Sequence, residues 1–220
     1  MKNKKSPTRN DTSPKARFQK KVKAKPLPKE GYLDGIYYES YTEYYVLSWL
    51  LELKNNGFVK EIRRSESFQL SENILNEYSI LLKRSTKSTT QTLAFGHSYT
   101  ADYDAIFTKK ALGKFCWLLG SGTKWEKHWL ICHAYKKDEY YCHIEVKPDF
   151  TDWKGKTSKA VNDCKWVYQK YGKFINIFKP ENRFEPTFTP SCYLLTGTGK
   201  PRKMKYTART LDQYLNNCNE

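Results

Sequence analysis

The sequence predicts an α/β fold in which a central mixed β-sheet is flanked by helices. Three features indicate this class: an apolar-periodic helix near the start, a series of short alternating segments, and a second helix followed by a short apolar segment. Helices that bracket a sheet in this order pack as layers around one core.

The first helix is expected over residues 41–54. Ser40 and Glu43 have the spacing of a capping box, in which each side chain satisfies a backbone N–H at the start of the helix. The pair Asn56-Gly57 is typical of a helix end. The apolar stripe that should face the core consists of Leu47, Leu50 and Leu51.

Alternating or continuous apolar segments predict the strands. A second helix is expected over residues 156–170, ending before Gly172, and a short helix near residues 211–215. Residues 72–98 give no clear prediction, and the polar, basic stretch at 83–90 indicates a loop. The expected strands are 58–63, 66–71, 99–107, 114–119, 128–135, 139–147 and 173–178.

Composition divides the chain into three parts. Hydrophobic residues make up 39% and aromatic residues 15% of the chain, enough for a real core. Residues 1–30 contain eleven Lys and Arg against two acids, so they carry +9 of the net charge of +16, and we expect a disordered basic arm. The arm is interpreted either as a solubilising or localising tail or as a sequence-independent grip on phosphates. A folded domain is expected over residues 31–180, with residues 181–220 as an extension packed on or beside it.

The net charge favours a nucleic acid as the partner, and the lack of a long apolar run argues against a membrane. Basic side chains that neutralise phosphates release condensed counterions, so a charge of +16 favours a nucleic acid. No stretch reaches the roughly 18–20 consecutive apolar residues of a membrane-spanning helix, and the polar N-terminus lacks the apolar run of a secretory signal. We therefore expect a soluble, cytoplasmic protein that does not bind a membrane.

The six cysteines contain no CxxC pair and are expected to be reduced, mostly buried thiols. The pairs Cys132-His133 and Cys142-His143 leave a structural zinc site as the alternative. Adjacent residues on a strand point to opposite faces, so neither pair readily offers both side chains to one ion.

The segment 139–147 carries the first part of a candidate active site. Its apolar residues share one face of the expected strand, and His143, Glu145 and Lys147 share the other, so a carboxylate and an ammonium group project side by side. Pro148 cannot donate a hydrogen bond to a sheet and places this pair at the end of the strand. The other interpretation is an ordinary surface ion pair, which contributes little.

Asp102 opens the expected strand 99–107 and supplies a second carboxylate. If that strand neighbours 139–147, Asp102 and Glu145 converge on one hard cation, and Mg²⁺ favours one or two carboxylates together with water and phosphate oxygens. Such an ion would polarise a phosphate and lower the pKa of a bound water. Lys147 would orient that water or stabilise charge on the phosphate. Asp104 is the alternative second ligand.

The segments Tyr-Thr-Ala-Asp-Tyr at 99–103 and Ile-Glu-Val-Lys-Pro at 144–148 resemble the core motif of the PD-(D/E)XK nuclease superfamily. The proline of the family motif is Ala101 here. The resemblance covers residues 31–180 and implies a restriction-endonuclease-like core: a helix, three antiparallel strands, a second helix and a further strand. The interval between Asp102 and Glu145 is long for the family and implies an extra β-hairpin insertion.

The resemblance also implies a role for the first helix. A glutamate there often binds or positions the metal in this family, and Glu43 fits because it lies on the inward stripe with Leu47 and Leu50. Otherwise it serves only as the capping-box partner, and Glu39 and Glu52 are weaker candidates. The implied catalytic set is Asp102, Glu145, Lys147 and Glu43, with Asp102, Glu145 and Glu43 as ligands of Mg²⁺, for which Mn²⁺ would substitute.

In this family the second helix lies beside the active site, and its basic residues face the DNA backbone. Lys159 is expected to point inward, with Lys156 and Lys165 at phosphates, unless the three form only a solvated face. Trp166 is expected in the core, with stacking on unpaired bases as the alternative. The expected basic loop adds three candidate nucleic-acid contacts: Lys83, Arg84 and Lys87.

These features predict a Mg²⁺-dependent DNA endonuclease encoded by a phage or mobile element, located in the host cytoplasm or associated with a virion. Phage head-completion nucleases, transposon-encoded restriction-like endonucleases and small phage endonucleases related to Holliday-junction resolvases are each similar to parts of the pattern. Symmetric cutting would need two sites and indicates a homodimer. The alternatives are a non-catalytic nucleic-acid-binding protein on a nuclease-like scaffold, and an RNA-binding or virion structural protein that depends on its basic arm.

Overall fold

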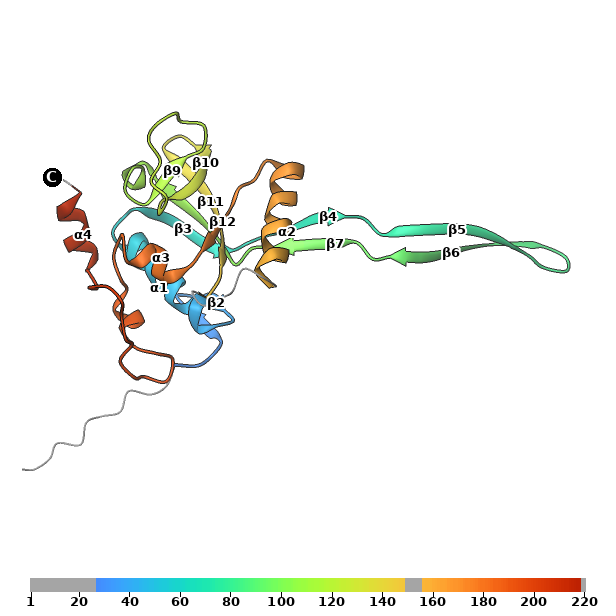
Figure 1. Ribbon diagram of the computed structural model, residues 1–220. Coiled ribbons are helices and arrows are strands. Elements are labelled where there is room, and N and C mark those ends of the chain that lie inside the picture. Colours follow the sequence, from blue (N-terminus) through green and yellow to red (C-terminus); the bar gives the residue numbers. More distant parts are fainter. Residues whose placement is uncertain (1–26, 149–155, 219–220) are drawn as a thin grey trace, which may run out of the picture.

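The computed structural model describes residues 27–148 and 156–218 (Figure 1). The predicted basic arm of residues 1–30 lies outside the described residues, except for its last four. Within the described ranges, no helix is both long enough and apolar enough to cross a membrane. The architecture is α/β, as predicted, with a mixed sheet and helices on both sides of it.

The first helix begins where the capping signals place it. Helix α1 spans Tyr41–Asn55, and Ser40 is its N-cap, with an extended backbone and a side-chain oxygen that accepts a hydrogen bond from Glu43 N at 3.2 Å. Gly57 follows the helix end at φ +74°, a backbone conformation that glycine adopts without strain. The predicted helix is confirmed to within one residue at each end.

A six-stranded sheet forms the centre of the protein. Its strands lie in the order β3-β8-β11-β10-β9, and β12 pairs with the second half of β11, beyond the part that pairs with β10. Strands β3, β8, β11 and β10 are antiparallel, whereas β9 is parallel to β10 and β12 is parallel to β11, which makes the sheet mixed. The bounds are β3 Val59–Arg64, β8 Tyr103–Thr108, β9 Cys116–Leu118, β10 Leu130–Lys136, β11 Glu139–Val146 and β12 Ile175–Phe178.

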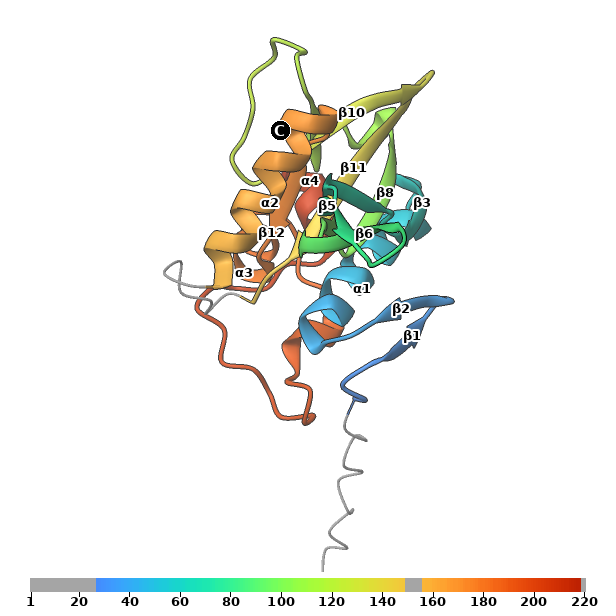
Figure 2. The same ribbon diagram turned by 90° about the vertical axis from the view of Figure 1, so that its right-hand side faces the viewer.

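Helices α1 and α2 (Lys156–Tyr171) cover opposite faces of this sheet (Figure 2). Side chains alternate along β11, so Cys142, Ile144 and Val146 pack with α1 in the main core, as predicted, while Glu145 faces α2. A smaller core lies between α2 and the sheet. It consists of Leu70, Tyr99, Ala101, Val167 and Ile175, with Phe68 and Cys164 at its margin.

Both ends of the described chain pack on this body. At the N-terminal end, β1 (Gly31–Leu33) and β2 (Ile36–Tyr38) form a small hairpin. The segment after residue 180 contains short helical elements and contributes several aromatic rings to the main core, so the predicted extension at 181–220 is part of the domain's packing. Its elements are α3 Pro180–Phe184, η2 Ser191–Leu194 and α4 Leu211–Asn217, and its core aromatics are Phe184, Phe188, Tyr193 and Tyr214.

The interval between Asp102 and Glu145 holds the short 3-10 helix η1 (Lys109–Ala111), β9 and β10. Strand β10 forms an antiparallel hairpin with β11 through a turn at Asp138, whose φ of +60° is one that aspartate tolerates better than most residues. The extra hairpin expected in this interval is therefore not present as a separate unit: β9 and β10 are parallel, and β10 pairs with the strand that carries Glu145.

Residues 67–100 form a much longer insertion, a two-stranded ribbon that extends away from the body (Figure 1). Next to the body β4 pairs with β7, and further out β5 pairs with β6, so the turn at residues 82–85 forms the tip. The bounds are β4 Ser67–Ser71, β5 Ile74–Leu81, β6 Thr86–Ala94 and β7 His97–Thr100.

One prediction for this region is confirmed and another is wrong. The strand expected at 66–71 is β4, whereas the loop expected at 83–90 is a tight turn at 82–85, and residues 86–90 belong to strand β6. A run of threonines, serines and lysines has the composition of a loop, but threonine is β-branched and suits a strand once a partner is paired along it. Eight successive residues of β5 have such a partner in β6.

The expected strand 99–107 is interrupted. Strand β7 ends at Thr100 and β8 begins at Tyr103, so Ala101 and Asp102 lie at the junction between the ribbon and the sheet. This break matters because it frees the Asp102 side chain from the regular alternation of a strand.

Candidate active site

The start of β8 and the end of β11 meet at the candidate active site. The backbone N–H of Asp102 donates to Ile144 O at 3.0 Å, and its side-chain Oδ2 accepts a hydrogen bond from Val146 N at 2.6 Å. The Asp102 carboxyl is therefore held against β11, close enough to Glu145 for the two negative charges to interact. Two acids that are far apart in the sequence become neighbours through strand pairing.

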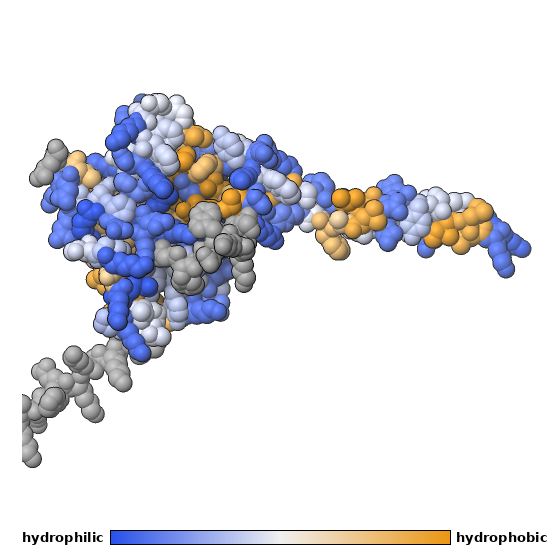
Figure 3. All heavy atoms as spheres, viewed as in Figure 1, coloured by the Kyte–Doolittle hydropathy of each residue, from blue (hydrophilic) through white to orange (hydrophobic). Residues whose placement is uncertain are grey.

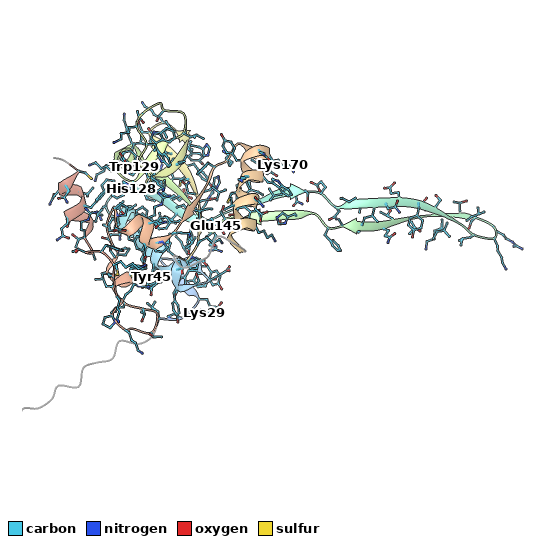
Figure 4. All side chains as sticks on the ribbon, viewed as in Figure 1. Lys29, Tyr45, His128, Trp129, Glu145 and Lys170 are labelled. Carbon is cyan, nitrogen blue, oxygen red and sulfur yellow. The ribbon has the colours of Figure 1, made fainter. Side chains whose placement is uncertain are left out.

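Glu145 is buried and has a partner at each carboxylate oxygen. The Tyr99 hydroxyl donates to Oε2 at 2.8 Å, and the Lys147 ammonium group pairs with Oε1. Tyr99 also contacts Cys164 Sγ of α2 at 3.5 Å, which fixes the ring from the far side. A quarter of the Lys147 side chain is exposed, so its ammonium group also reaches solvent. Figure 4 shows Glu145 within the body, toward the side from which the ribbon leaves.

Around the Asp102 carboxyl group, negative charge exceeds positive charge. Burial raises the pKa of Asp102, and the negative charges of Glu145 and Glu43 raise it further, to about 7, against the opposing effects of the Val146 N–H and Lys147. When the pKa of a carboxyl group is raised in this way, a cation that binds beside it stabilises the charged carboxylate.

Glu43 lies at the start of α1 and is largely buried. Its Oε1 accepts from the Ser40 hydroxyl at 3.0 Å, and its Oε2 accepts from Glu39 N at 3.0 Å and from Arg64 Nη1 at 3.0 Å. Arg64 also pairs with Glu39 at 3.3 Å. Glu43 therefore has the helix-capping role and, at the same time, adds its negative charge to the environment of Asp102.

Among the described residues, no three His, Cys, Asp or Glu side chains are arranged to hold a metal ion together. The predicted ligands Asp102, Glu145 and Glu43 interact electrostatically, but Arg64 and the α1 cap engage Glu43. Asp102 and Glu145 are the two carboxylates that could share a cation. Of the weaker candidates, Glu39 pairs with Arg64, and burial raises the pKa of Glu52, with Asp212 of α4 raising it further.

Asp104 belongs to a separate buried cluster. Its carboxylate accepts from Ser65 Oγ at 2.8 Å and from the Tyr141 hydroxyl, and it contacts His143 Nδ1 at 2.7 Å. Burial tends to raise the pKa of Asp104, but hydrogen bonds from His143 and Tyr141 outweigh it and lower the pKa. Arg63 Nε lies 3.7 Å from Asp104 Oδ2. Asp104 and His143 are thus bound to each other rather than to Asp102 and Glu145.

The basic residues of α2 whose side chains the structure describes do not point into the site. Lys159 and Lys165 are exposed, so the expected inward orientation of Lys159 is wrong: the inward positions of this helix are Ala160, Asp163 and Val167. Lys159 instead borders an open hollow that also contains His97 and Trp166. The side chain of Lys156 lies outside what the structure describes.

Trp166 is also placed differently from the prediction. Half of its side chain is exposed, and its ring lies 6.3 Å from that of His97, whose Nε2 contacts Asp163 at 2.9 Å. The indole is therefore available on the outer side of α2 and contributes little to the core.

The other predicted nucleic-acid contacts lie at the far end of the ribbon. Lys83 and Arg84 form its turn, and Lys87 is one residue into β6 (Figure 1). They were expected in a loop of the nuclease domain, whereas the ribbon holds them away from Asp102 and Glu145.

Two residues of the site were missed in the sequence. Tyr99 holds Glu145, and Arg64 holds Glu43 and lies over the Tyr103 ring, 5.3 Å from its centre. Tyr99 could have been found from the sequence, because it stands three residues before Asp102 in the Tyr-Thr-Ala-Asp-Tyr segment at 99–103. No sequence pattern indicates Arg64, because only the pairing of β3 with β8 brings it to the site.

A hollow of about 210 Å³ lies beside the end of β11. Thr42 of α1, Pro148 and Lys205 are among the residues that line it. Arg202 also lines it, stacked over the rings of Tyr45 and Tyr193. Glu181 also lines this hollow and pairs with Lys205 at 3.9 Å, so the lining carries two cations and one acid.

The thiols of Cys116, Cys132 and Cys142 lie together in the main core, where burial raises the pKa of Cys132 well above its usual value. The neighbouring histidines lie elsewhere: His143 contacts Asp104, and His133 accepts a hydrogen bond from Phe174 N. Neither Cys-His pair brings both side chains to one point, as strand alternation requires.

No protein-family model, curated protein or solved structure matches the chain. Its function has to be inferred from the residues that the fold brings together.

Proposed function

We propose that the protein is a divalent-metal-dependent nuclease that hydrolyses DNA phosphodiester bonds, with Asp102, Glu145 and Lys147 as its catalytic residues. The observation that carries the proposal is the convergence of two carboxylates and an ammonium group from the start of β8 and the end of β11. The order of helix α1, antiparallel strands β3, β8 and β11, helix α2 and parallel strand β12 agrees with the core of the PD-(D/E)XK superfamily and supports it.

The donor set fits a divalent ion. Three carboxylates, of Asp102, Glu145 and Glu43, lie near one another, and the cations beside them are Lys147 and Arg64, which leaves a net negative charge. Oxygen ligands of this kind suit Mg²⁺ or Mn²⁺. Asp102 and Glu145 would hold the ion, and water and phosphate oxygens would complete its coordination. A bound divalent ion supplies a more acidic water and neutralises charge on the phosphate.

The chain's own residues would act around that ion. Tyr99 fixes the rotamer of Glu145 through one oxygen, which leaves the other oxygen facing Lys147. Val146 N fixes the Asp102 carboxylate in the same way. Lys147 is partly exposed and cationic, so it can donate a hydrogen bond to the attacking water or to a phosphate oxygen as negative charge develops there. Arg64 and Glu43 are positioning residues in this scheme.

DNA is the proposed substrate because the chain carries a net charge of +16. Exposed Lys159 and Lys165 on α2, together with Lys205 beside the hollow at the end of β11, are proposed to contact the phosphate backbone. Contacts of this kind position the duplex without reading its sequence.

The test is a cleavage assay on supercoiled plasmid and on a branched DNA, in Mg²⁺ and in EDTA, with Glu145→Gln as the variant. The variant removes the charge of a proposed metal ligand while keeping the hydrogen bond from Tyr99. We expect the cleavage rate to fall by at least about 100-fold, by analogy with the loss seen when even outer residues of a metal site are changed.

Glu61→Gln is the matched control, because it makes the same chemical change at an exposed position of β3. It should cleave like the wild type. Cleavage that persists in EDTA, or that Glu145→Gln leaves intact, would overturn the proposal. DNA binding without cleavage in every condition would instead identify a non-catalytic nucleic-acid-binding protein.

A further inference from the structure

The outer half of the ribbon exposes apolar side chains along its whole length. Every residue of β5 is exposed, Leu81 to 84%, and Phe95 at the end of β6 is exposed to 85%. The space-filling view shows apolar residues along the ribbon, far from the body (Figure 3). Exposed apolar surface of this extent on one element marks a contact site.

The base of the ribbon is fixed to the body. Lys170 Nζ donates to Gln69 O at 2.8 Å and the Tyr171 hydroxyl donates to the same oxygen at 2.6 Å, while Leu70 and Tyr99 are buried beneath α2. Figure 4 shows Lys170 on α2 near the point where the ribbon leaves the body. The outer half is therefore held out in a defined direction, although a two-stranded hairpin by itself is only marginally stable in water.

The free edge of β5 is complementary to itself. Because β5 belongs to a two-stranded sheet, one of its edges has no strand beside it within the described residues. A two-fold axis through Ile80 would pair β5 with a second β5 in antiparallel fashion. Residues directly opposite then have numbers that add to the same total, so Glu77 faces Lys83, and Tyr78 faces Leu82.

This register satisfies charge and apolar contact together. Glu77 is the acid of β5, and the cations Lys83 and Arg84 lie at the tip. An antiparallel arrangement brings the tip of one copy to the acid of the other, twice per pair. Shifting the axis by one residue in either direction places Leu75 or Ser79 opposite Lys83 and loses the ion pairs. Edge strands of this kind are ready templates for pairing.

We propose that β5 is a dimerisation edge whose partner is a second copy of this chain, paired antiparallel about Ile80. The two ribbons overlap at their outer ends, over residues 78–82, where Tyr78 and Ile80 of each copy, which share a face, meet Leu82 and Ile80 of the other. Leu82 and Lys83 belong to the tip turn that follows β5, so the contact joins the end of each β5 to the tip of the other ribbon. This inference holds whether or not the body is a nuclease.

A nucleic acid is a less suitable occupant of the same edge. Phosphates select Lys and Arg, and β5 offers an acid, apolar side chains and hydroxyls, with the cations confined to the tip and the adjoining end of β6. Exposed leucine and isoleucine side chains gain most from contact with other apolar side chains.

The first test is sedimentation equilibrium of the full chain across a range of concentrations up to about 100 µM, a range suited to weak as well as tight dimers. The wild type is expected to dimerise. The triple variant Tyr78→Thr, Ile80→Thr, Leu82→Thr places a β-branched residue, which favours a strand, at each position and is expected to be monomeric. Tyr32→Thr is the control, because it removes an exposed aromatic ring from β1, away from the ribbon, and should still dimerise.

The second test uses charge. Glu77→Lys places two cations opposite each other, and Lys83→Glu places two acids opposite each other. Each variant alone is therefore expected to dimerise about 2- to 30-fold more weakly than the wild type, which is twice the usual effect of one cross-strand pair. An equimolar mixture of the two variants restores both ion pairs in a heterodimer, and the wild-type affinity should return.

A monomeric wild type at 100 µM, a triple variant that still dimerises, or a mixture no tighter than the separate variants would each overturn the proposal. Fluorescence anisotropy with a labelled duplex identifies the competing case. If the wild type stays monomeric and the triple variant binds DNA more weakly than the wild type, the ribbon is a nucleic-acid-binding arm.

Discussion

The body and the ribbon are built from similar strands but differ in what covers them. Strands β8 and β11 pair in regular antiparallel register, as β5 and β6 do. In the body, Tyr103, Phe107 and Ile144 are fully buried beneath α1. In the outer half of the ribbon, β5 and β6, the described residues place no helix or second sheet over either face, and the apolar side chains remain exposed, whereas α2 covers Leu70 and Tyr99 at the base.

This comparison separates two contributions to strand structure. Backbone pairing and β-branched side chains are enough to form the ribbon, but the free energy of folding comes from apolar area removed from water. The body has that area and the outer half of the ribbon lacks it. Substitutions of apolar residues should therefore destabilise the body strongly and the outer half of the ribbon hardly at all.

The largest loss of stability is expected for Trp49→Ala in α1. Trp49 is almost completely buried and its ring stacks on Phe188 at 5.5 Å and contacts Phe178 and Phe115, so it joins α1 to the sheet and to the C-terminal segment. Truncation should lower the free energy of unfolding by about 3–5 kcal/mol, measured by urea denaturation.

Trp49→Phe is the matched control. It keeps a ring in contact with the neighbouring aromatics and removes a buried indole N–H that has no hydrogen-bond partner. It should cost clearly less than the alanine variant. Equal losses from both variants would mean that the aromatic contacts are not what stabilises this part of the body.

A smaller effect, of opposite sign, is expected for Asp102→Asn in the absence of divalent ions. Folding raises the pKa of Asp102 from 3.8 to about 7, so the folded protein binds this proton more tightly and the wild type loses stability as pH rises from about 4 to 7. In EDTA at pH 8, Asp102→Asn should be more stable than the wild type by on the order of 1–3 kcal/mol. The difference should vanish near pH 4.

Thermal unfolding across pH 4–8 measures this difference. Adding Mg²⁺ at pH 8 provides the second readout: it should raise the melting temperature of the wild type and leave that of Asp102→Asn almost unchanged, because a ligand stabilises only the state that binds it. A variant less stable than the wild type at pH 8 in EDTA would contradict the electrostatic account of the site.

The body was largely predictable because its signals are local. Ser40 and Gly57 bracket α1, and the alternation around Glu145 predicted which side chains of β11 pack in a core and which lie on the opposite face. At the base of the ribbon the strand expected at 66–71 is confirmed as β4. The outer half was not predictable, because the threonine-rich segment of β6 resembles a loop and only its pairing with β5 turns it into a strand. The break at Asp102 likewise depends on how the ribbon joins the sheet.

The candidate site shows the same division. Glu145 and Lys147 are two residues apart, so their contact follows from strand geometry. Arg64 and Tyr99 reach the site only through tertiary pairing, and local sequence carries no signal for Arg64. Lys159 was expected to point inward from its place in a family pattern, yet the apolar periodicity of α2 turns Ala160 and Val167 inward and Lys159 outward.

The smallest effect is expected for Leu81→Thr in the ribbon. Leu81 is 84% exposed, so the chain loses almost no buried area, and threonine favours a strand. At concentrations where the chain is monomeric, the free energy of unfolding should change by less than about 0.5 kcal/mol. Leu53→Thr in α1, where the leucine is completely buried, is the paired measurement and should cost several times more. A large loss from Leu81→Thr in the monomer would show that the chain covers its own ribbon in solution, and the distinction between body and ribbon would fail.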